Sequence, residues 1–314
     1  MSTTSTAPSA SRPAANRRRT RIGSGDLPFV VTIVVICGAV LFATLYPIYF
    51  VMIASISDPT AVATGNVVFF PRNISFFGYQ QIFEDSRIWT GYRNTLIYSV
   101  VGTLLNLVVT LPAAYALSRR EFRPRRPLML FFAFTMFFSG GLIPTYLLYR
   151  DLGLLDNWLV FILPSALNVY NLIIARAFFE NSLPEELFEA AMIDGVDYFR
   201  FFATIALPLS KALISVIGLY YLVQHWNDFF TGLIFVRDYD KQPLQIVLRD
   251  ILLSNQAFSG GAGGAGGSGG AYGQRYADQI KYGVIIVSTL PVIILYPFLQ
   301  RYFEKGVLIG SVKG

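Results

Sequence analysis

A short acidic segment near the middle of the chain holds the residues whose types and spacing point most clearly to an interaction. Residues 180–197 carry six carboxylates, and Arg200 is the only basic residue between positions 180 and 200. Ala190 and Ala191 stand among these acids, and small residues permit another helix to approach closely. The segment can therefore pair with basic groups on a partner protein, although a solvated surface helix would have the same pattern.

The same segment is punctuated as a helix. Ser182 and Glu185 have the S-x-x-E spacing of a capping box, and Pro184 falls in the first turn, where a missing N–H costs least. Gly195 follows the last helical residues and can take the left-handed conformation that often ends a helix. We therefore expect a helix over 185–195 that is too short and too polar to span a membrane.

The chain offers little to catalytic chemistry. Its one cysteine, Cys37, excludes an intrachain disulfide, and its one histidine, His225, excludes a metal site built from several imidazoles. No G-x4-GK[S/T] phosphate-binding sequence is present, so ATP is not expected to bind this chain. We expect no catalytic residue, no metal and no cofactor in the chain itself.

The composition indicates a membrane protein. Of the 314 residues, 54% are hydrophobic and 14% are charged, whereas soluble domains carry about 25% charged residues. The mean hydropathy of +0.51 agrees with this. These values exclude a disordered chain, a coiled coil and a nucleic-acid-binding domain, and they argue against a soluble enzyme.

Uncharged stretches of about 20 residues are long enough to cross a bilayer as a helix. Five such stretches lie between charged residues, and a sixth is interrupted by Lys211 and Asp228. We therefore predict an all-α, polytopic membrane protein with six transmembrane helices. The expected spans are 27–57 and about 94–118, 127–149, 157–175, 203–236 and 282–300.

The distribution of basic residues orients these spans. With a cytoplasmic N-terminus, 16 of the 25 Lys and Arg residues lie inside, including dense clusters at 17–21 and 119–126. Both termini are then expected in the cytoplasm. The remaining segments are expected to be a disordered tail at 1–25, an outer loop at 58–91 and a tail at 304–314. A second outer loop, at 259–273, is rich in glycine and is expected to be flexible.

A spaced motif connects the acidic segment with a known family. Glu189-Ala190-Ala191 is followed after three residues by Gly195, and after nine more by Ile205-Ala206-Leu207-Pro208. This pattern matches the EAA motif, EAA-x3-G-x9-I-x-LP, of the membrane permeases of binding-protein-dependent ABC importers. Residues 92–303 resemble the MetI-like permease domain of that family.

Other segments are similar to the carbohydrate branch of this family. These segments are 207–211, 225–229 and the C-terminal stretch from Tyr296. They look closest to the permeases of polysaccharide and oligosaccharide importers. Of the two permeases that pair in such importers, the chain resembles the one similar to the maltose permease G subunit. Two departures are visible: Ala212 stands where the family often has proline, and the glycine-rich stretch lengthens the last outer connection. Neither departure touches the EAA motif.

The resemblance implies a transport subunit of the bacterial cytoplasmic membrane and not an enzyme. It implies that 185–195 is the coupling helix, which docks into a cleft on an ATPase subunit. The coupling residues would be Glu185, Glu189, Ala190, Ala191, Asp194, Gly195, Leu207 and Pro208. The implied partners are a paralogous permease in a heterodimer, two ATPase subunits that hold ATP and Mg, and an extracytoplasmic binding protein that delivers a carbohydrate.

The substrate path is less clearly marked. Amides beside aromatic rings suit sugars, although helix-to-helix hydrogen bonds use the same residue types. The candidates are Asn168, Tyr170, Asn171, Gln224, Trp226 and Asn227. We expect His225 to be structural and Asp228 to cap or pair near the outer end.

Three alternatives stay open. One is an importer permease for another solute, such as a peptide or amino acid. An ion-coupled secondary transporter would want an intramembrane carboxylate or an inverted repeat, and an integral membrane enzyme would need clustered acids, histidines or a nucleophile pair.

Overall fold

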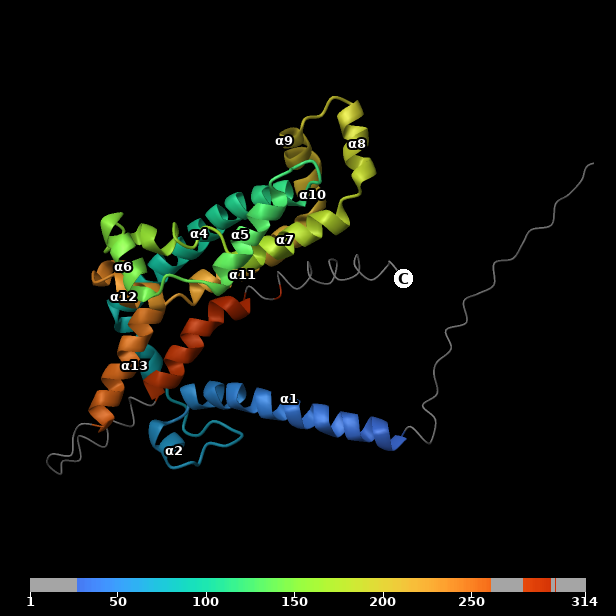
Figure 1. The fold of residues 1–314 in the computed structure, drawn as a ribbon. Helices are drawn as coiled ribbons and strands as arrows, with labels where there is room; N and C mark the ends of the chain where they lie inside the picture. The colour runs from blue at the N-terminus through green and yellow to red at the C-terminus, as the bar shows by residue number, and fades with distance from the viewer. Residues whose placement is uncertain (1–26, 261–278, 295–296, 298–314) are drawn as a thin grey trace, which may run out of the picture. The chain divides into compact units, whose positions relative to one another are not determined.

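The computed structural model describes residues 27–260, 279–294 and 297, and all regular structure in these residues is helical (Figure 1). The chain divides into two units, 1–49 and 50–314, each of which is described by itself. The expected tails 1–25 and 304–314 and nearly all of the glycine-rich stretch 259–273 lie outside the described residues.

The first unit is formed by helix α1 (Leu27–Ser55) up to Tyr49. The helix carries no charged residue, and the hydroxyls of its two threonines are satisfied within it. The hydroxyls of Thr32 and Thr44 donate to the carbonyls of Pro28 and Val40, at 2.8 and 2.9 Å. These two hydroxyls therefore present no free donor to an apolar surrounding, which suits a membrane-spanning helix.

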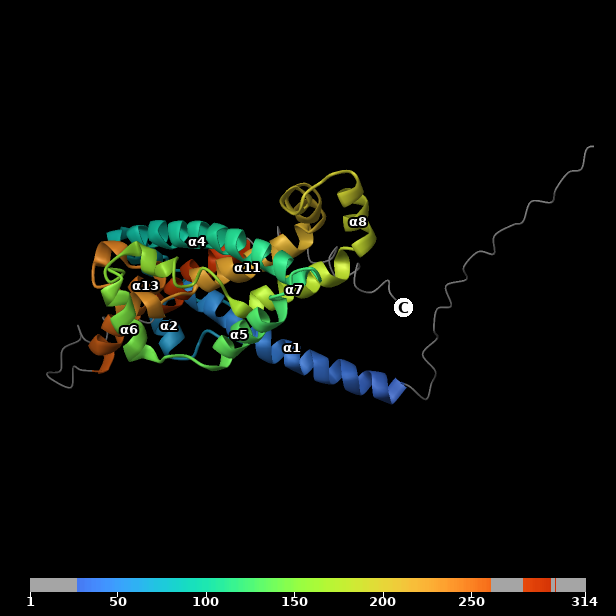
Figure 2. The ribbon, with the colours of Figure 1, turned by 45° about the horizontal axis from the view of Figure 1, so that its top comes forward.

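The second unit is built around the long helix α4 (Ser86–Ser118). Helices α7 (Val169–Ser182) and α11 (Lys211–Trp226) pack along it (Figure 2). Apolar side chains of all three helices fill the space between them. The fully buried members include Leu172, Ala175, Phe179, Ile217 and Tyr221.

Some buried polar groups in this core are paired with one another, whereas the hydroxyls of Ser99, Thr103 and Tyr115 on α4 are buried without a partner among the described residues. The Tyr221 and Thr110 hydroxyls lie 2.7 Å apart, and His225 Nε2 lies 2.7 Å from Asn106 Oδ1. The amide of Asn106 also donates to the carbonyl of Ser165. A buried polar group without a partner would be costly, so these pairs fix the contact of α4 with α11. His225 is structural, as expected.

Several apolar segments are bent instead of forming one straight helix. Helices α5 (Arg125–Phe137) and α6 (Leu142–Asp151) meet at 114°. A short 3-10 helix, η1 (Trp158–Phe161), precedes α7. Helix α9 (Tyr198–Phe201), the π-helical turn η2 (Phe202–Ala206) and α10 (Leu207–Leu209) together lie at 83° to α11.

Length and apolar composition identify two helices of the described residues that can cross a membrane, Pro28–Ser55 and Ser86–Ser118. The count rises to four if each bent pair is one span, and a shorter apolar helix runs over Gln279–Ile294. The all-helical class is thus confirmed, whereas the number of six spans stays a prediction.

The second unit contains five further elements among the described residues. They are α2 (Pro59–Ala63), α3 (Phe77–Glu84), α12 (Phe230–Phe235), η3 (Tyr239–Lys241) and α13 (Leu244–Gly260). Helix α13 was not anticipated from the sequence. It packs on α4 through Leu244, Val247, Leu248 and Ile251, which recur with the period of one helix face.

Asp156 ties two connections together. Its Oδ1 accepts hydrogen bonds from the backbone N–H groups of Arg237 (2.6 Å) and Asp238 (2.9 Å). These bonds, led by the one from Asp238, lower the pKa of Asp156 below its ordinary value, and Lys241 adds to the effect. Asp228 accepts from the backbone N–H of Thr231 at 3.1 Å, which confirms the expected cap.

Candidate functional site

The acidic segment forms helix α8 (Glu185–Ile193), which lies with α9 and α10 at one end of the α4–α7–α11 bundle (Figure 1). The helix ends as predicted. Gly195 has a φ of +77°, its N–H donates to the Met192 carbonyl, and the N–H of Val196 donates to the Ala191 carbonyl. These two bonds are those of a Schellman motif, which a glycine in the left-handed conformation permits.

The predicted capping box is wrong. Ser182 is the last residue of α7, so its backbone is already helical and its side chain is not available to cap the next helix. Pro184 stands at the N-cap position, and the start of α8 has no side-chain cap. Glu185 instead forms an ion pair with Arg120, with Arg120 Nη1 3.3 Å from Glu185 Oε2.

One side of α8 belongs to the core of the bundle. The rings of Tyr198 and Phe201 lie 5.0 and 5.2 Å from the ring of Phe188, measured between centroids. Phe188 and Ala191 are buried in the same cluster as residues of α4, α7 and α11. The predicted coupling residue Ala191 therefore faces inward.

Arg119, at the end of α4, connects α8 and α9 from the inside. Its guanidinium carbon lies 4.6, 5.1 and 5.5 Å from the ring centroids of Tyr115, Phe188 and Phe201. Nε and Nη2 of this guanidinium are buried and have no hydrogen-bond partner among the described residues. Cation–π attraction, which strengthens with desolvation, holds the group there. Sequence reasoning counted Arg119 only as part of a basic cluster.

The other side of α8 is exposed and combines acids with large apolar side chains. Ile193 and, from α9, Phe199 are 87% and 79% exposed. The exposed residues on this side, called the docking surface after the role proposed below, are Glu186, Glu189, Ala190, Met192, Ile193, Asp194 and Phe199. Contiguous exposed apolar side chains among charges are typical of a protein-protein contact.

The Ile205–Pro208 part of the motif forms the bend into α11. Pro208 lacks an N–H and its ring crowds the preceding turn, so the turn Phe202–Ala206 widens and the N–H of Leu207 donates to the carbonyl of Phe202. Leu207 is half-buried and Pro208 is exposed. Both coupling candidates thus lie in the bent segment that joins α8 and α9 to α11.

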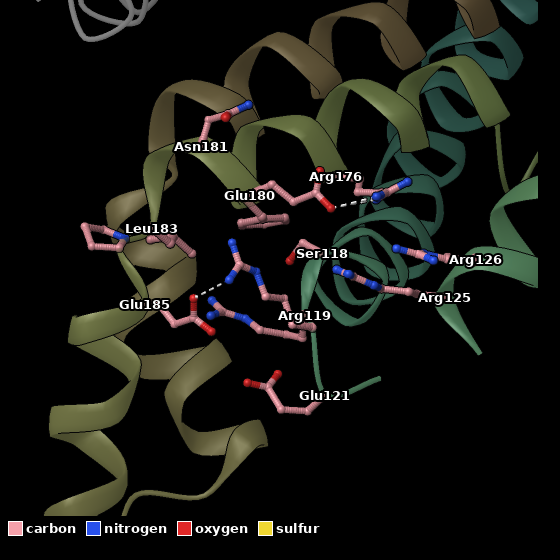
Figure 3. A pocket seen from close by; sticks show the side chains of 13 residues that line it. Ser118, Arg119, Glu121, Arg125, Arg126, Arg176, Glu180, Asn181, Leu183 and Glu185 are labelled. Atoms are coloured by element: carbon pink, nitrogen blue, oxygen red, sulfur yellow. Dashed lines mark hydrogen bonds and ion pairs between the residues drawn. The ribbon is translucent and has the colours of Figure 1, made fainter. Parts of the chain in front are cut away.

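A pocket of about 560 Å³ opens beside the start of α8 (Figure 3). The ends of α4 and α7 and the start of α5 surround it, and most of its polar lining is charged. Arg176 pairs with Glu180 at 2.7 Å, and Arg120 pairs with Glu185. The charged residues of the lining are Arg119, Arg120, Glu121, Arg125, Arg126, Arg176, Glu180 and Glu185.

The structure gives the substrate-path candidates different surroundings. Asn168 caps α7 by accepting from the N–H of Asn171, which is buried. Trp226 is buried and donates to the carbonyl of Ser288 at 3.1 Å, so it serves packing. The exposed candidates are Tyr170, Gln224 and Asn227, and the amide of Asn227 donates to the carbonyl of Val223.

Comparison with known proteins gives concordant results. Residues 88–309 match the family described as binding-protein-dependent transport system inner membrane component. Protein LplC of Bacillus subtilis is 39% identical over 91% of this chain and 95% of its own length. The polygalacturonan/rhamnogalacturonan transport system permease protein YtcP of the same organism is 38% identical over 85% of this chain and 92% of its own.

A solved structure is similar throughout. It is the crystal structure of a bacterial ABC transporter involved in the import of the acidic polysaccharide alginate. One of its chains is 33% identical to this one and superposes with a TM-score of 0.79, over 90% of this chain and 98% of that chain.

Proposed function

Because this chain belongs to the binding-protein-dependent transport system inner membrane components, the multi-pass permease subunits of ABC importers, we propose that α8 is its coupling helix. The chain is a non-catalytic transport subunit of the inner membrane. In the proposal, α8 docks on a separate ATPase subunit that holds ATP and Mg, and it carries the motion of that subunit into the membrane bundle.

The two-sided construction of α8 is the observation that carries this proposal. A helix that transmits force must be anchored on one side and free to bind on the other. Phe188 and Ala191 anchor α8 in the core shared with α4, α7 and α11, and Arg119 adds a cation–π contact with the ring of Phe188. Glu189 and Ile193 remain exposed for a partner.

The route from α8 to the bundle runs through the bent segment. Helices α9 and α10 continue from the Gly195 turn and meet α11 at 83°. If α8, α9 and α10 move together, a displacement of α8 would rotate α11 against α4, since packed helices move as units and do not deform continuously. Alternating access of the transport path would follow from such a rotation.

Topology and partners complete the proposal. The basic cluster 119–126 lies at the same end as α8, and by the positive-inside rule this supports a cytoplasmic position for that end. We propose six spans with both termini cytoplasmic. The assembly would contain a paralogous permease as heterodimer partner, two ATPase subunits and an extracytoplasmic solute-binding protein.

The proposed substrate is an oligosaccharide or polysaccharide. Its support is the similarity, at 33–38% identity over most of the chain, to YtcP and to the alginate transporter, whose names give such substrates. Tyr170, with Gln224, is the better candidate for sugar contact, because both side chains are exposed and neither has a hydrogen bond within the described residues. Asn171 and Trp226 are kept as structural supports.

Charge reversal on the docking surface tests the coupling role. Tagged wild-type chain in its native membrane should co-purify with an ATPase, and Glu189→Lys should reduce the recovered ATPase at least tenfold. Glu84→Lys makes the same charge change on an exposed residue of α3 and should leave recovery unchanged. Equal ATPase recovery with both variants would refute the docking role.

Substrate is tested separately, with the binding protein recovered in the same purification. Binding of acidic and neutral oligosaccharides to it is measured by calorimetry. The carbohydrate proposal fails if neither class binds and a peptide or amino acid does.

A further inference from the structure

The pocket beside α8 carries more positive charge than its own carboxylates neutralise. It is lined by five arginines and three glutamates. Two arginines are used in the ion pairs with Glu180 and Glu185. Arg125 and Arg126, at the start of α5, have no carboxylate partner among the described residues.

The two arginines without a carboxylate partner point the same way. In Figure 3 the side chains of Arg125 and Arg126 extend toward the end of α4 at Ser118, near Arg176. Arg119 also lines the pocket, but its guanidinium is held against the rings of Tyr115, Phe188 and Phe201. Glu121 is the remaining acid in the lining, so the pocket has a surplus of two positive charges. Guanidinium groups bind phosphate oxygens through paired N–H donors, so a phosphate group suits this lining.

The helix below the arginines identifies the source of the phosphate. No residue of α5 is buried, and large apolar side chains follow directly after the two arginines. Leu130, Phe131, Phe134 and Phe137 are all exposed along this helix. A charged pocket at the head of an exposed apolar helix matches an amphiphile with an anionic head, whereas a free phosphate or an acidic peptide would make no use of the apolar part.

We propose that this pocket binds the phosphate of an anionic phospholipid, such as phosphatidylglycerol, whose acyl chains lie along α5. Basic pockets between membrane helices at the cytoplasmic side bind such headgroups. The lipid would join α4, α5 and α7 beside Glu185, the first residue of α8, and would therefore steady the base of that helix. The assignment rests on the cytoplasmic position proposed above for this end of the bundle, but not on ATPase docking, and it can therefore fail while the docking role holds.

Thermal unfolding of the full purified chain in detergent, with added lipid and without any ATPase, tests the proposal. Phosphatidylglycerol should raise Tm more than phosphatidylcholine does. The Arg125→Gln/Arg126→Gln variant should need about tenfold or more phosphatidylglycerol for the same rise. The Arg123→Gln/Arg200→Gln variant has the same net charge but changes two arginines outside the lining, and it should respond like wild type.

Any of the following three results would overturn the proposal. If both double variants lose the response equally, the effect is one of net charge. If inorganic phosphate at millimolar concentration gives the same rise as the lipid, the ligand is a free anion. If neither raises the wild-type Tm, the pocket serves another partner, such as an acidic segment of the ATPase. The Tm of each variant in phosphatidylcholine alone verifies that it is folded.

Discussion

Substitution of Gly195 by valine isolates the part of the coupling site that the structure defines best. Gly195 has a φ of +77°, a conformation that a β-branched residue adopts only under strain. A Cβ built at this position would meet no atom within 4 Å. The strain of Gly195→Val is therefore expected mainly in the backbone, since the space around the Cβ position is open.

The size of this strain follows from the backbone geometry. A residue other than glycine held in the left-handed region costs about 1–3 kcal/mol. That range corresponds to a shift of about 5- to 150-fold toward conformations in which the turn opens. Opening the turn would change the direction of α8 relative to α9, while the buried core of the bundle would remain.

The chain contains a matched control. Gly153 follows α6 with a φ of +68°, and a Cβ there would also meet no atom within 4 Å. Its N–H donates to the carbonyl of Arg150, and the next N–H donates to the carbonyl of Tyr149, so this turn has the same two hydrogen bonds as the turn at Gly195. Gly153→Val thus applies the same strain at the other end of the bundle.

Transport of labelled substrate into vesicles that contain the whole complex is the assay. We expect Gly195→Val to transport at less than a tenth of the wild-type rate, Gly153→Val at more than half, and both to insert normally. Gly195→Asn should keep most activity, because asparagine tolerates the left-handed region, as Asn73 does here with a φ of 45°. Normal transport by Gly195→Val, or equal loss at both glycines, would refute the reasoning.

Three further predictions concern the parts that hold the bundle together. Gly102→Ala places a Cβ on the imidazole of His225 and should lower the unfolding free energy by about 1–3 kcal/mol. Gly218→Ala on the facing helix is the control: a Cβ there has its nearest contact at 3.6 Å, so the change should be neutral or stabilising. The two variants are compared by urea unfolding. Arg119→Met removes the cation from its aromatic cage and should lower the free energy of unfolding by about 2 kcal/mol. We expect a lower Tm and weaker ATPase recovery, and an unchanged Tm would contradict this. The backbone N–H groups of Asp238 and Arg237 lower the pKa of folded Asp156, so its carboxylate stabilises the fold at neutral pH and this contribution is lost as the pH falls through the folded pKa. Asp156→Asn should therefore lower Tm at pH 7 and lower it progressively less as the medium becomes acidic, and a Tm difference that is constant with pH would count against it.

The site was largely readable from the sequence because its signals are local. The extent of α8 depends on Pro184, Gly195 and the acids between them, and the left-handed conformation of Gly195 was predicted from residue type alone. The capping box failed because it required Ser182 to lie outside a helix, and the preceding helix α7 extends through that residue. Which face of α8 is buried depends on the tertiary packing of Phe188, which local sequence does not contain.

The bends and the packing at the far end were harder to predict. The length of an uncharged stretch identifies an apolar segment but does not show where its backbone bends. The segment 157–175 was therefore expected as one span, although it contains η1, an irregular stretch and the first half of α7. Helix α13 was missed because Arg249 and Asp250 make it too polar to be noticed as a span, although its apolar residues repeat at helical spacing. The role of Arg119 requires three aromatic rings from separate helices.

Cross-linking from the exposed side of α8 tests the central claim most directly. Cys37 is the only cysteine, so a Cys37→Ser chain accepts a single photoreactive label at a chosen cysteine. Ile193→Cys places the label on the docking surface, and Leu152→Cys places it on an exposed residue after α6, at the other end of the bundle. In native membranes the label at 193 should form an adduct with the ATPase and the label at 152 should not. Absence of the ATPase adduct at 193, or equal adducts at both positions, would contradict the assignment of α8 as the coupling helix.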